Sequence, residues 1–153
     1  MHSLLLSSDF DSFLLREAQI TTFSTFQIDG RFHGEWLNSD ETDRDAPLPD
    51  YASWSMVRPF CYSLIRGRRT PLSFRFVFAL APYNVQKLLS QTGIDLSPSD
   101  IHGLYLNLHY DGKCLNAVTG TSLSVFTLDK SLDHAWDELV EKFFLKKGLF
   151  FEK

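Results

Sequence analysis

Hydrophobic residues alternate with other residues most regularly over 74–80 and 104–110, where Phe, Leu or Tyr occupies every second position. A period of two is typical of a strand that buries one face. Between these segments, Pro82 precedes apolar residues at helical spacing, and Gly93 follows the last of them. Proline is favoured in the first turn of a helix and glycine just after its last turn. The pattern therefore predicts a strand, a helix and a second strand.

A hairpin is predicted directly after this unit. Asp111-Gly112 favours a tight turn, because glycine readily adopts the positive φ angles that such turns need. We expect a returning strand over 113–119 and a further strand over 122–128. The N-terminal half shows a weaker version of the same order. The elements expected there are a strand at 2–7, a helix that starts at Ser8 or Asp9, strands at 20–28 and 31–36 that Asp29-Gly30 connects, and a strand at 57–65.

The clearest helix signal follows these strands. Leu132, Trp136 and Leu139 belong to an apolar series with the spacing i, i+3, i+4, i+7. A stripe of this kind buries one face of an α-helix. We expect this helix over about 130–147, and Gly148 is expected to end it.

Together these elements predict an α+β fold. It would contain an antiparallel sheet, or two sheets, made of two pseudo-repeated βαβββ units over 1–65 and 71–128, with the C-terminal helix packed on it. A chain of 153 residues with 14 phenylalanines has enough apolar surface for one core. We therefore expect a single domain over 1–153.

Two segments within 74–128 resemble parts of one domain of the bacterial DNA sliding clamp. FRFVFALAPYNVQKLL is similar to a strand and helix of a clamp repeat, and GLYLNLHYDGKCLNAVTGTSLSVF is similar to its hairpin and closing strand. The resemblance implies a DNA-clamp-like fold with a duplicated unit. It departs from the clamps in two respects. A clamp subunit joins two or three such domains, and the helices expected here carry few Lys or Arg to face phosphates.

Three further segments, ITTFSTFQIDGR, VRPFCYSLI and TGTSLSVFTLDKS, are similar to a small bacterial family of unassigned function. This second resemblance covers most of the chain and implies no activity.

Charge is distributed unevenly along the chain. The whole sequence has a formal net charge of −4. Residues 51–94 nevertheless contain five arginines, one lysine and no Asp or Glu. A local excess of positive charge favours an anionic partner, such as nucleic acid or an acidic protein.

Three arginines in this segment form the strongest candidate site. Gly67 and Pro71 predict a turn between two strands, so Arg66, Arg68 and Arg69 would project from one basic hairpin tip. The guanidinium group binds phosphate or carboxylate through two parallel hydrogen bonds. This tip is therefore a candidate anion-binding site.

Two flanking arginines, Arg58 and Arg75, enlarge this candidate site if their strands point them the same way. The alternative is a solvent-facing tip that docks on the chain's own acidic segment at 38–50. That segment is rich in acids and contains two prolines, which predicts an exposed loop.

Aromatic residues flank the same acidic segment. If Trp36, Tyr51 and Trp54 are exposed, they form a groove that holds a peptide or stacks a base. The alternative is that they anchor the base of the loop.

Catalytic and metal-binding patterns are absent from the sequence. The five histidines lack metal-ligand spacing, and the eight glycines occur singly rather than in a phosphate-binding loop. Cys61 and Cys114 are expected to be free thiols, with Cys61 in the core. We therefore expect no metal and no cofactor, and the sequence favours a function other than catalysis.

No stretch approaches the ~20 apolar residues of a membrane span, and the start of the chain lacks the basic residues of a signal peptide. We expect a cytoplasmic protein that does not contact membranes. The leading hypothesis is a non-catalytic binding or assembly module whose basic region meets an anionic partner. Two alternatives stay open: an enzyme that holds a phosphorylated small molecule with the arginines, and a homo-oligomeric structural protein.

Overall fold

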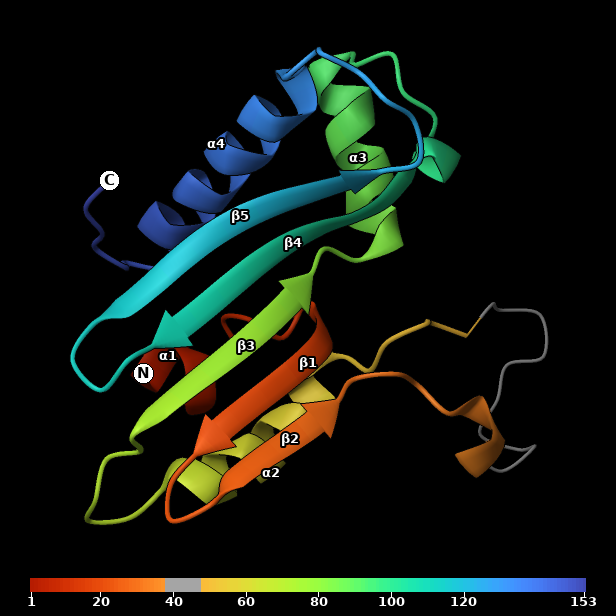
Figure 1. The fold of residues 1–153 in the computed structure, drawn as a ribbon. Helices are drawn as coiled ribbons and strands as arrows, with labels where there is room; N and C mark the ends of the chain where they lie inside the picture. The colour runs from red at the N-terminus through yellow and green to blue at the C-terminus, as the bar shows by residue number, and fades with distance from the viewer. Residues whose placement is uncertain (38–47) are drawn as a thin grey trace.

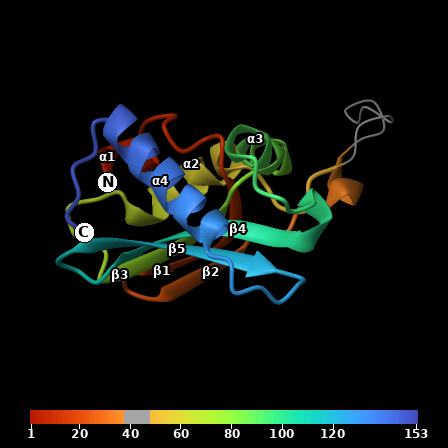
Figure 2. The same cartoon turned by 90° about the horizontal axis from the view of Figure 1, so that it is seen from above.

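The computed structural model describes residues 1–37 and 48–153 (Figure 1). Within these residues, five strands form one antiparallel sheet in the order β2-β1-β3-β4-β5. Four α-helices cover one face of this sheet, and the other face is open (Figure 2). The predicted α+β class with a C-terminal helix is confirmed. The strands are β1 (Leu14–Thr21), β2 (Thr25–Asp29), β3 (Ser73–Ala79), β4 (Ile101–Tyr110) and β5 (Leu115–Leu123), and the helices are α1 (His2–Leu5), α2 (Trp54–Ile65), α3 (Pro82–Thr92) and α4 (Ser131–Lys146).

The core lies between the sheet and the helices. Phe74, Phe76 and Phe78 alternate along β3 toward the helices and are buried. The ring of Trp54, from α2, lies with its centroid 5.1 Å from that of Phe76 and 5.0 Å from that of Phe78. Trp136, from α4, is also buried. Its indole N–H donates to the carbonyl of Tyr105 on β4 at 2.9 Å. α2 therefore packs on β3, and α4 reaches β4.

The second half of the chain follows the predicted pattern. α3 begins at Pro82 and ends before Gly93, whose φ of 68° lies in the left-handed region that favours glycine. The carboxylate of Asp111 accepts hydrogen bonds from the backbone N–H groups of Lys113 and Cys114 and so closes the β4–β5 turn. The long helix α4 is also present as predicted.

β5 differs from the prediction in length. The two strands expected over 113–119 and 122–128 are joined, because residues 118–121 all pair with β4 and the strand continues to Leu123. The separate strand expected over 122–128 is therefore wrong.

The first half of the chain differs more. Leu4 and Leu5 are adjacent in sequence and both buried, which fits a short helix and not an alternating strand, so the strand expected at 2–7 is wrong. The helix expected from residue 8 or 9 is also wrong, because β1 occupies much of that segment. Residues 22–24 reverse the chain between β1 and β2, so the strand expected at 20–28 is two strands.

The turn expected at residues 29–30 is absent for a steric reason. A Cβ at Gly30 would lie 1.8 Å from the carbonyl oxygen of Leu15, so the backbone here passes directly against β1. Glycine provides space at this position and does not reverse the chain. A short 3-10 helix at Gly34–Trp36 replaces the second half of the strand expected over 31–36.

The strand expected at 57–65 is part of α2. Trp54, Val57, Cys61 and Ile65 are buried and follow one another at helical spacing. The first half therefore reads helix, strand, strand, helix, whereas the second half reads strand, helix, strand, strand, helix. The predicted repeat of βαβββ units, and with it the clamp-like fold, is not confirmed. Most of the acidic segment expected to form a loop lies at 38–47, outside the described residues.

Candidate functional site

The connection between α2 and β3, residues 66–72, carries the candidate arginines and is called the basic loop below. The N–H of Arg66 donates to the carbonyl of Tyr62 at the end of α2, and the N–H of Leu72 donates to the carbonyl of Thr21 on β1. Pro71 is buried, whereas Arg66, Arg68 and Arg69 are all exposed. The loop is thus fixed at both ends and presents three guanidinium groups to solvent at one end of the sheet (Figure 1).

Two neighbouring turns share this end of the sheet (Figure 1). The β4–β5 turn approaches the basic loop closely, since a Cβ at Gly112 would lie 3.0 Å from the carbonyl oxygen of Leu72. This turn adds Lys113, which is exposed. The β1–β2 turn adds Phe23, whose side chain is 94% exposed. Positive charge and an exposed aromatic ring therefore occur on the same end of the molecule.

No carboxylate in residues 1–37 and 48–153 forms an ion pair with the three arginines. Asp111 lies in the adjacent turn, and backbone hydrogen bonds from Cys114 and Lys113 lower the pKa of its carboxyl group. The acids at 38–47, which were considered as an internal partner, belong to the part of the chain that is not described.

Arg58 and Arg75 do not join the basic loop. The guanidinium group of Arg58 donates to the carbonyl of Ser7 at 2.6 Å and to the carboxylate of Asp11 at 3.1 Å. Arg75 lies on the open face of the sheet and pairs with Glu17 on β1. Both arginines therefore make contacts within the fold. Arg58 lies on a helix and not on the expected strand, and Arg75 lies on a strand but pairs with a neighbouring strand.

The expected aromatic groove is wrong for one of its three residues. Trp54 is fully buried, and its indole N–H donates to the carbonyl of Leu4 at 3.0 Å. Trp36 is 82% exposed, and Tyr51 is half-buried and forms a single β-bridge with Arg31. Trp54 thus anchors the N-terminal helix in the core, and this contact differs from the expected alternative, in which the aromatic residues anchor the base of the loop.

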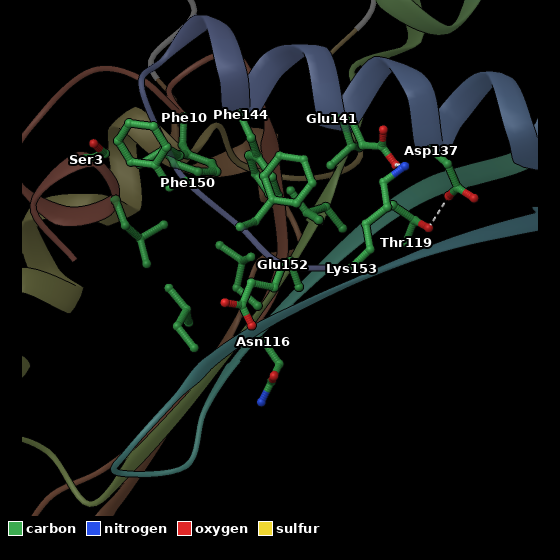
Figure 3. A pocket seen from close by; sticks show the side chains of 18 of the residues that line it. Ser3, Phe10, Asn116, Thr119, Asp137, Glu141, Phe144, Phe150, Glu152 and Lys153 are labelled. Carbon is green, nitrogen blue, oxygen red and sulfur yellow. Dashed lines mark hydrogen bonds and ion pairs between the residues drawn. The ribbon is translucent and has the colours of Figure 1, made fainter.

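A cavity of about 890 Å³ lies elsewhere, between α4, β5 and the segment Leu149–Lys153 (Figure 3). Its surface includes Leu106, Leu108 and Ala117 from the sheet, and Phe10 and Phe144 on the helix side. Figure 3 shows the rings of Phe10, Phe144 and Phe150 gathered at one end and Asp137, Glu141 and Lys153 at the other. The cavity is therefore apolar over much of its wall and charged at one end.

Specific contacts fix the charged end of the cavity. The hydroxyl of Thr119 on β5 donates to the carboxylate of Asp137 on α4, and that of Thr121 donates to Asp133 in the same way. The ammonium group of Lys153 lies 2.9 Å from the carboxylate of Glu141. None of the candidate arginines lines this cavity. The enzyme alternative required a polar pocket that contains them, and the cavity does not provide it.

Reactive groups are sparse. Burial raises the pKa of the Cys61 thiol to about 12, so this side chain is a packed core thiol and not a nucleophile. Cys114 is free and exposed in the β4–β5 turn. Within the described ranges, no group of three or more His, Cys, Asp or Glu side chains is placed to hold a metal ion. No helix among the described residues is long and apolar enough to cross a membrane.

A family model described as "Family of unknown function (DUF5721)" matches residues 3–152. The chain belongs to this family. No curated protein and no solved structure matches the chain. The family is consistent with the predicted resemblance to a group of unassigned function, and the resemblance to the sliding clamp is not confirmed.

The sequence interpretation missed the cavity and the edge strand beside it. The available signal was the run from Cys114 to Leu128, which contains no charged residue and no proline. A stretch of this kind is unusual for a strand at the edge of a sheet.

Proposed function

We propose that this chain is a non-catalytic binding module whose basic loop binds an anionic partner in the cytoplasm, with the phosphate groups of nucleic acid as the favoured ligand. The observation that supports the proposal is the basic loop itself. Three exposed arginines occur within four residues, on a connection held at both ends by hydrogen bonds to the fold. A fixed loop loses little conformational entropy when it binds, so its charges are well placed to contact phosphates.

Two further features favour nucleic acid over a generic acidic surface. Arginine pairs with phosphate through two donors at once. Phe23 is exposed on the neighbouring turn, and aromatic rings stack on unpaired bases at a gain of roughly 1–3 kcal/mol per base. Single-stranded nucleic acid is therefore expected to bind more tightly than duplex.

The test is a binding titration with labelled single-stranded and double-stranded DNA and RNA across a salt series. The substitutions Arg66→Ala, Arg68→Ala and Arg69→Ala are made together. For the unchanged protein, we expect affinity to fall as salt rises. Each phosphate contact contributes roughly 0.7 to the slope for single strands and 0.9 for duplex, so the triple variant is expected to lose a slope of roughly 2–3.

A matched control removes the same amount of charge elsewhere. Lys87, Lys142 and Lys146 are exposed on α3 and α4, and changing all three to Ala leaves the basic loop intact. This control is expected to bind nearly as well as the unchanged protein. If both triple variants lose binding equally, binding depends on net charge and not on the loop. If neither DNA nor RNA binds at low salt but polyglutamate binds, the partner is an acidic protein and the nucleic-acid proposal is wrong.

A further variant tests internal docking of the loop. Neutralising Asp40, Glu41, Asp43 and Asp45 with Asn is expected to leave the affinity for nucleic acid within about threefold, apart from the general effect of net charge. A much larger gain in affinity would mean that these acids compete for the arginines.

A further inference from the structure

Among residues 1–37 and 48–153, the outer edge of the sheet at β5 lacks the features that normally prevent strand pairing. β5 is the last strand in the sheet, and within the described residues it pairs only with β4. It is nine residues long and contains no charged residue and no proline. Edge strands usually carry lysine, proline or a bulge, or lie under another element, because their free N–H and C=O groups otherwise attract another strand.

An apolar cavity opens beside the same edge. Leu115, Ala117 and Thr119 line it from β5, at the alternate positions that face the helices. Phe144 and Val140 line it from α4. A strand placed next to β5 would direct every second side chain into this space, since side chains alternate between the two faces of a sheet. The free N–H and C=O groups of β5 can pair with the added strand, and the cavity can bury apolar side chains of that strand.

The charges around the cavity are mainly negative. Asp137, Glu141 and Glu152 line it, and Lys153 is its one cationic side chain among the described residues. The segment Leu149–Lys153 also indicates which chemistry the site accepts. Its Phe151 ring packs edge-on against Phe144 at 5.7 Å between centroids, and Lys153 pairs with Glu141. An aromatic residue followed two positions later by a lysine is thus already bound at the rim.

We propose that the β5 edge and this cavity form a binding site for an extended peptide segment of a partner protein, with apolar residues at alternate positions and at least one Lys or Arg. The segment adds a sixth strand to the sheet beside β5. Its apolar side chains enter the cavity below α4, and its basic side chain meets Asp137, Glu141 or Glu152. This mode combines affinity from main-chain hydrogen bonds with specificity from the cavity.

This site is separate from the one proposed above, because no residue of the basic loop lines the cavity. The β5 site also requires a partner whose charge is opposite to that of the partner of the basic loop. The basic loop selects anions, whereas the carboxylates at the cavity select a cationic segment. A negative result for one proposal therefore does not contradict the other.

The test starts with selection of random displayed peptides of about twelve residues, long enough to pair with all of β5. The full chain is the bait. The enriched peptides are expected to alternate apolar residues and to contain Lys or Arg. When such a peptide is added to isotope-labelled protein, the amide NMR signals of 115–123 are expected to shift, and those of the β2 edge are not.

Substitutions then test the two parts of the site. Ala117→Lys places a charge in the cavity wall at the edge and is expected to weaken binding of the enriched peptide at least tenfold, whereas Gln27→Lys, at an exposed position on the opposite edge strand, is expected to have no effect. Glu152→Gln removes a carboxylate that lines the cavity and is expected to weaken binding by about fivefold, the size of a surface ion pair of ~1 kcal/mol.

The proposal is overturned if no peptide is enriched, if the enriched peptides lack the alternating pattern, or if the NMR shifts map outside β5. It is also overturned if the protein forms dimers in which the amides of β5 become protected from exchange as concentration rises, because the edge then belongs to a second copy. The shift map of the unchanged protein decides the question even if Ala117→Lys fails to fold.

Discussion

Gly30 and Gly120 differ in the space around them, although neither has a positive φ. A Cβ at Gly30 would lie 1.8 Å from the carbonyl oxygen of Leu15, and that backbone is held by β1. A Cβ at Gly120, within β5, meets nothing within 4 Å. The two glycines therefore separate the effect of crowding from the effect of backbone conformation.

We expect Gly30→Ala to lower the free energy of unfolding by about 1–3 kcal/mol, because a rigid backbone must move to admit the methyl group. Gly120→Ala is the control and is expected to change it by no more than about 0.5 kcal/mol. Urea denaturation followed by tryptophan fluorescence measures both values. Equal values for the two variants would contradict the close backbone approach at Gly30.

At the scale of elements, an ion pair connects α2 to the N-terminal segment. Arg58 on α2 pairs with Asp11 at 3.1 Å, and both side chains are about one-fifth exposed. The pair of Arg75 with Glu17 is the natural comparison, since both of its side chains are about half exposed. Partly buried pairs are more sensitive to loss of one partner, because the remaining charge loses its compensation.

We expect Asp11→Ala to lower the free energy of unfolding by about 1–3 kcal/mol, since the guanidinium group of Arg58 stays partly buried without its carboxylate. Glu17→Ala is expected to change it by less than about 1 kcal/mol, as is usual for exposed pairs. The comparison uses thermal or urea unfolding of the two variants. If Glu17→Ala lowers the free energy of unfolding more than Asp11→Ala does, the exposure of an ion pair does not determine its contribution to stability.

Elements whose apolar residues recur at a regular spacing were predictable from the sequence. Elements whose apolar residues fit both a helix and a strand were not. The phenylalanines of β3 alternate without interruption, so the strand could be located from the pattern alone. In α2, Trp54, Val57, Cys61 and Ile65 are spaced as on a helix, but the apolar and aromatic residues of this segment suggested a strand. Tertiary burial of that face against β1 and β3 decided the outcome, and a local pattern does not contain that information.

Some features of the candidate site were likewise predictable from the sequence, and others were not. The three arginines of the basic loop were predictable because charge and turn residues are visible in a sequence. The internal partners of Arg58 and Arg75, and the cavity beside β5, depend on which segments the fold brings together. Asp137 and Thr119, for example, are 18 positions apart and come together because α4 packs on β5.

At the scale of the whole molecule, the two halves of the chain share one core. β3 pairs with β1 on one side and with β4 on the other. Phe10 contacts Phe78 of β3 and Phe143 of α4, with centroid distances of 5.8 and 5.2 Å. Such contacts predict that the chain unfolds as one domain.

Two single-tryptophan proteins test this expectation. Trp36→Phe with Trp136→Phe leaves Trp54, which reports on α2, and Trp36→Phe with Trp54→Phe leaves Trp136, which reports on α4. Because the core is continuous, we expect fluorescence and far-UV circular dichroism to give the same urea midpoint within each protein, as a two-state transition requires. The midpoints of the two proteins differ from each other, since each replacement of a buried tryptophan has its own cost. If Trp54 changes at lower urea than the circular dichroism of the same protein, the first half unfolds separately, and the chain comprises two units that meet at β3.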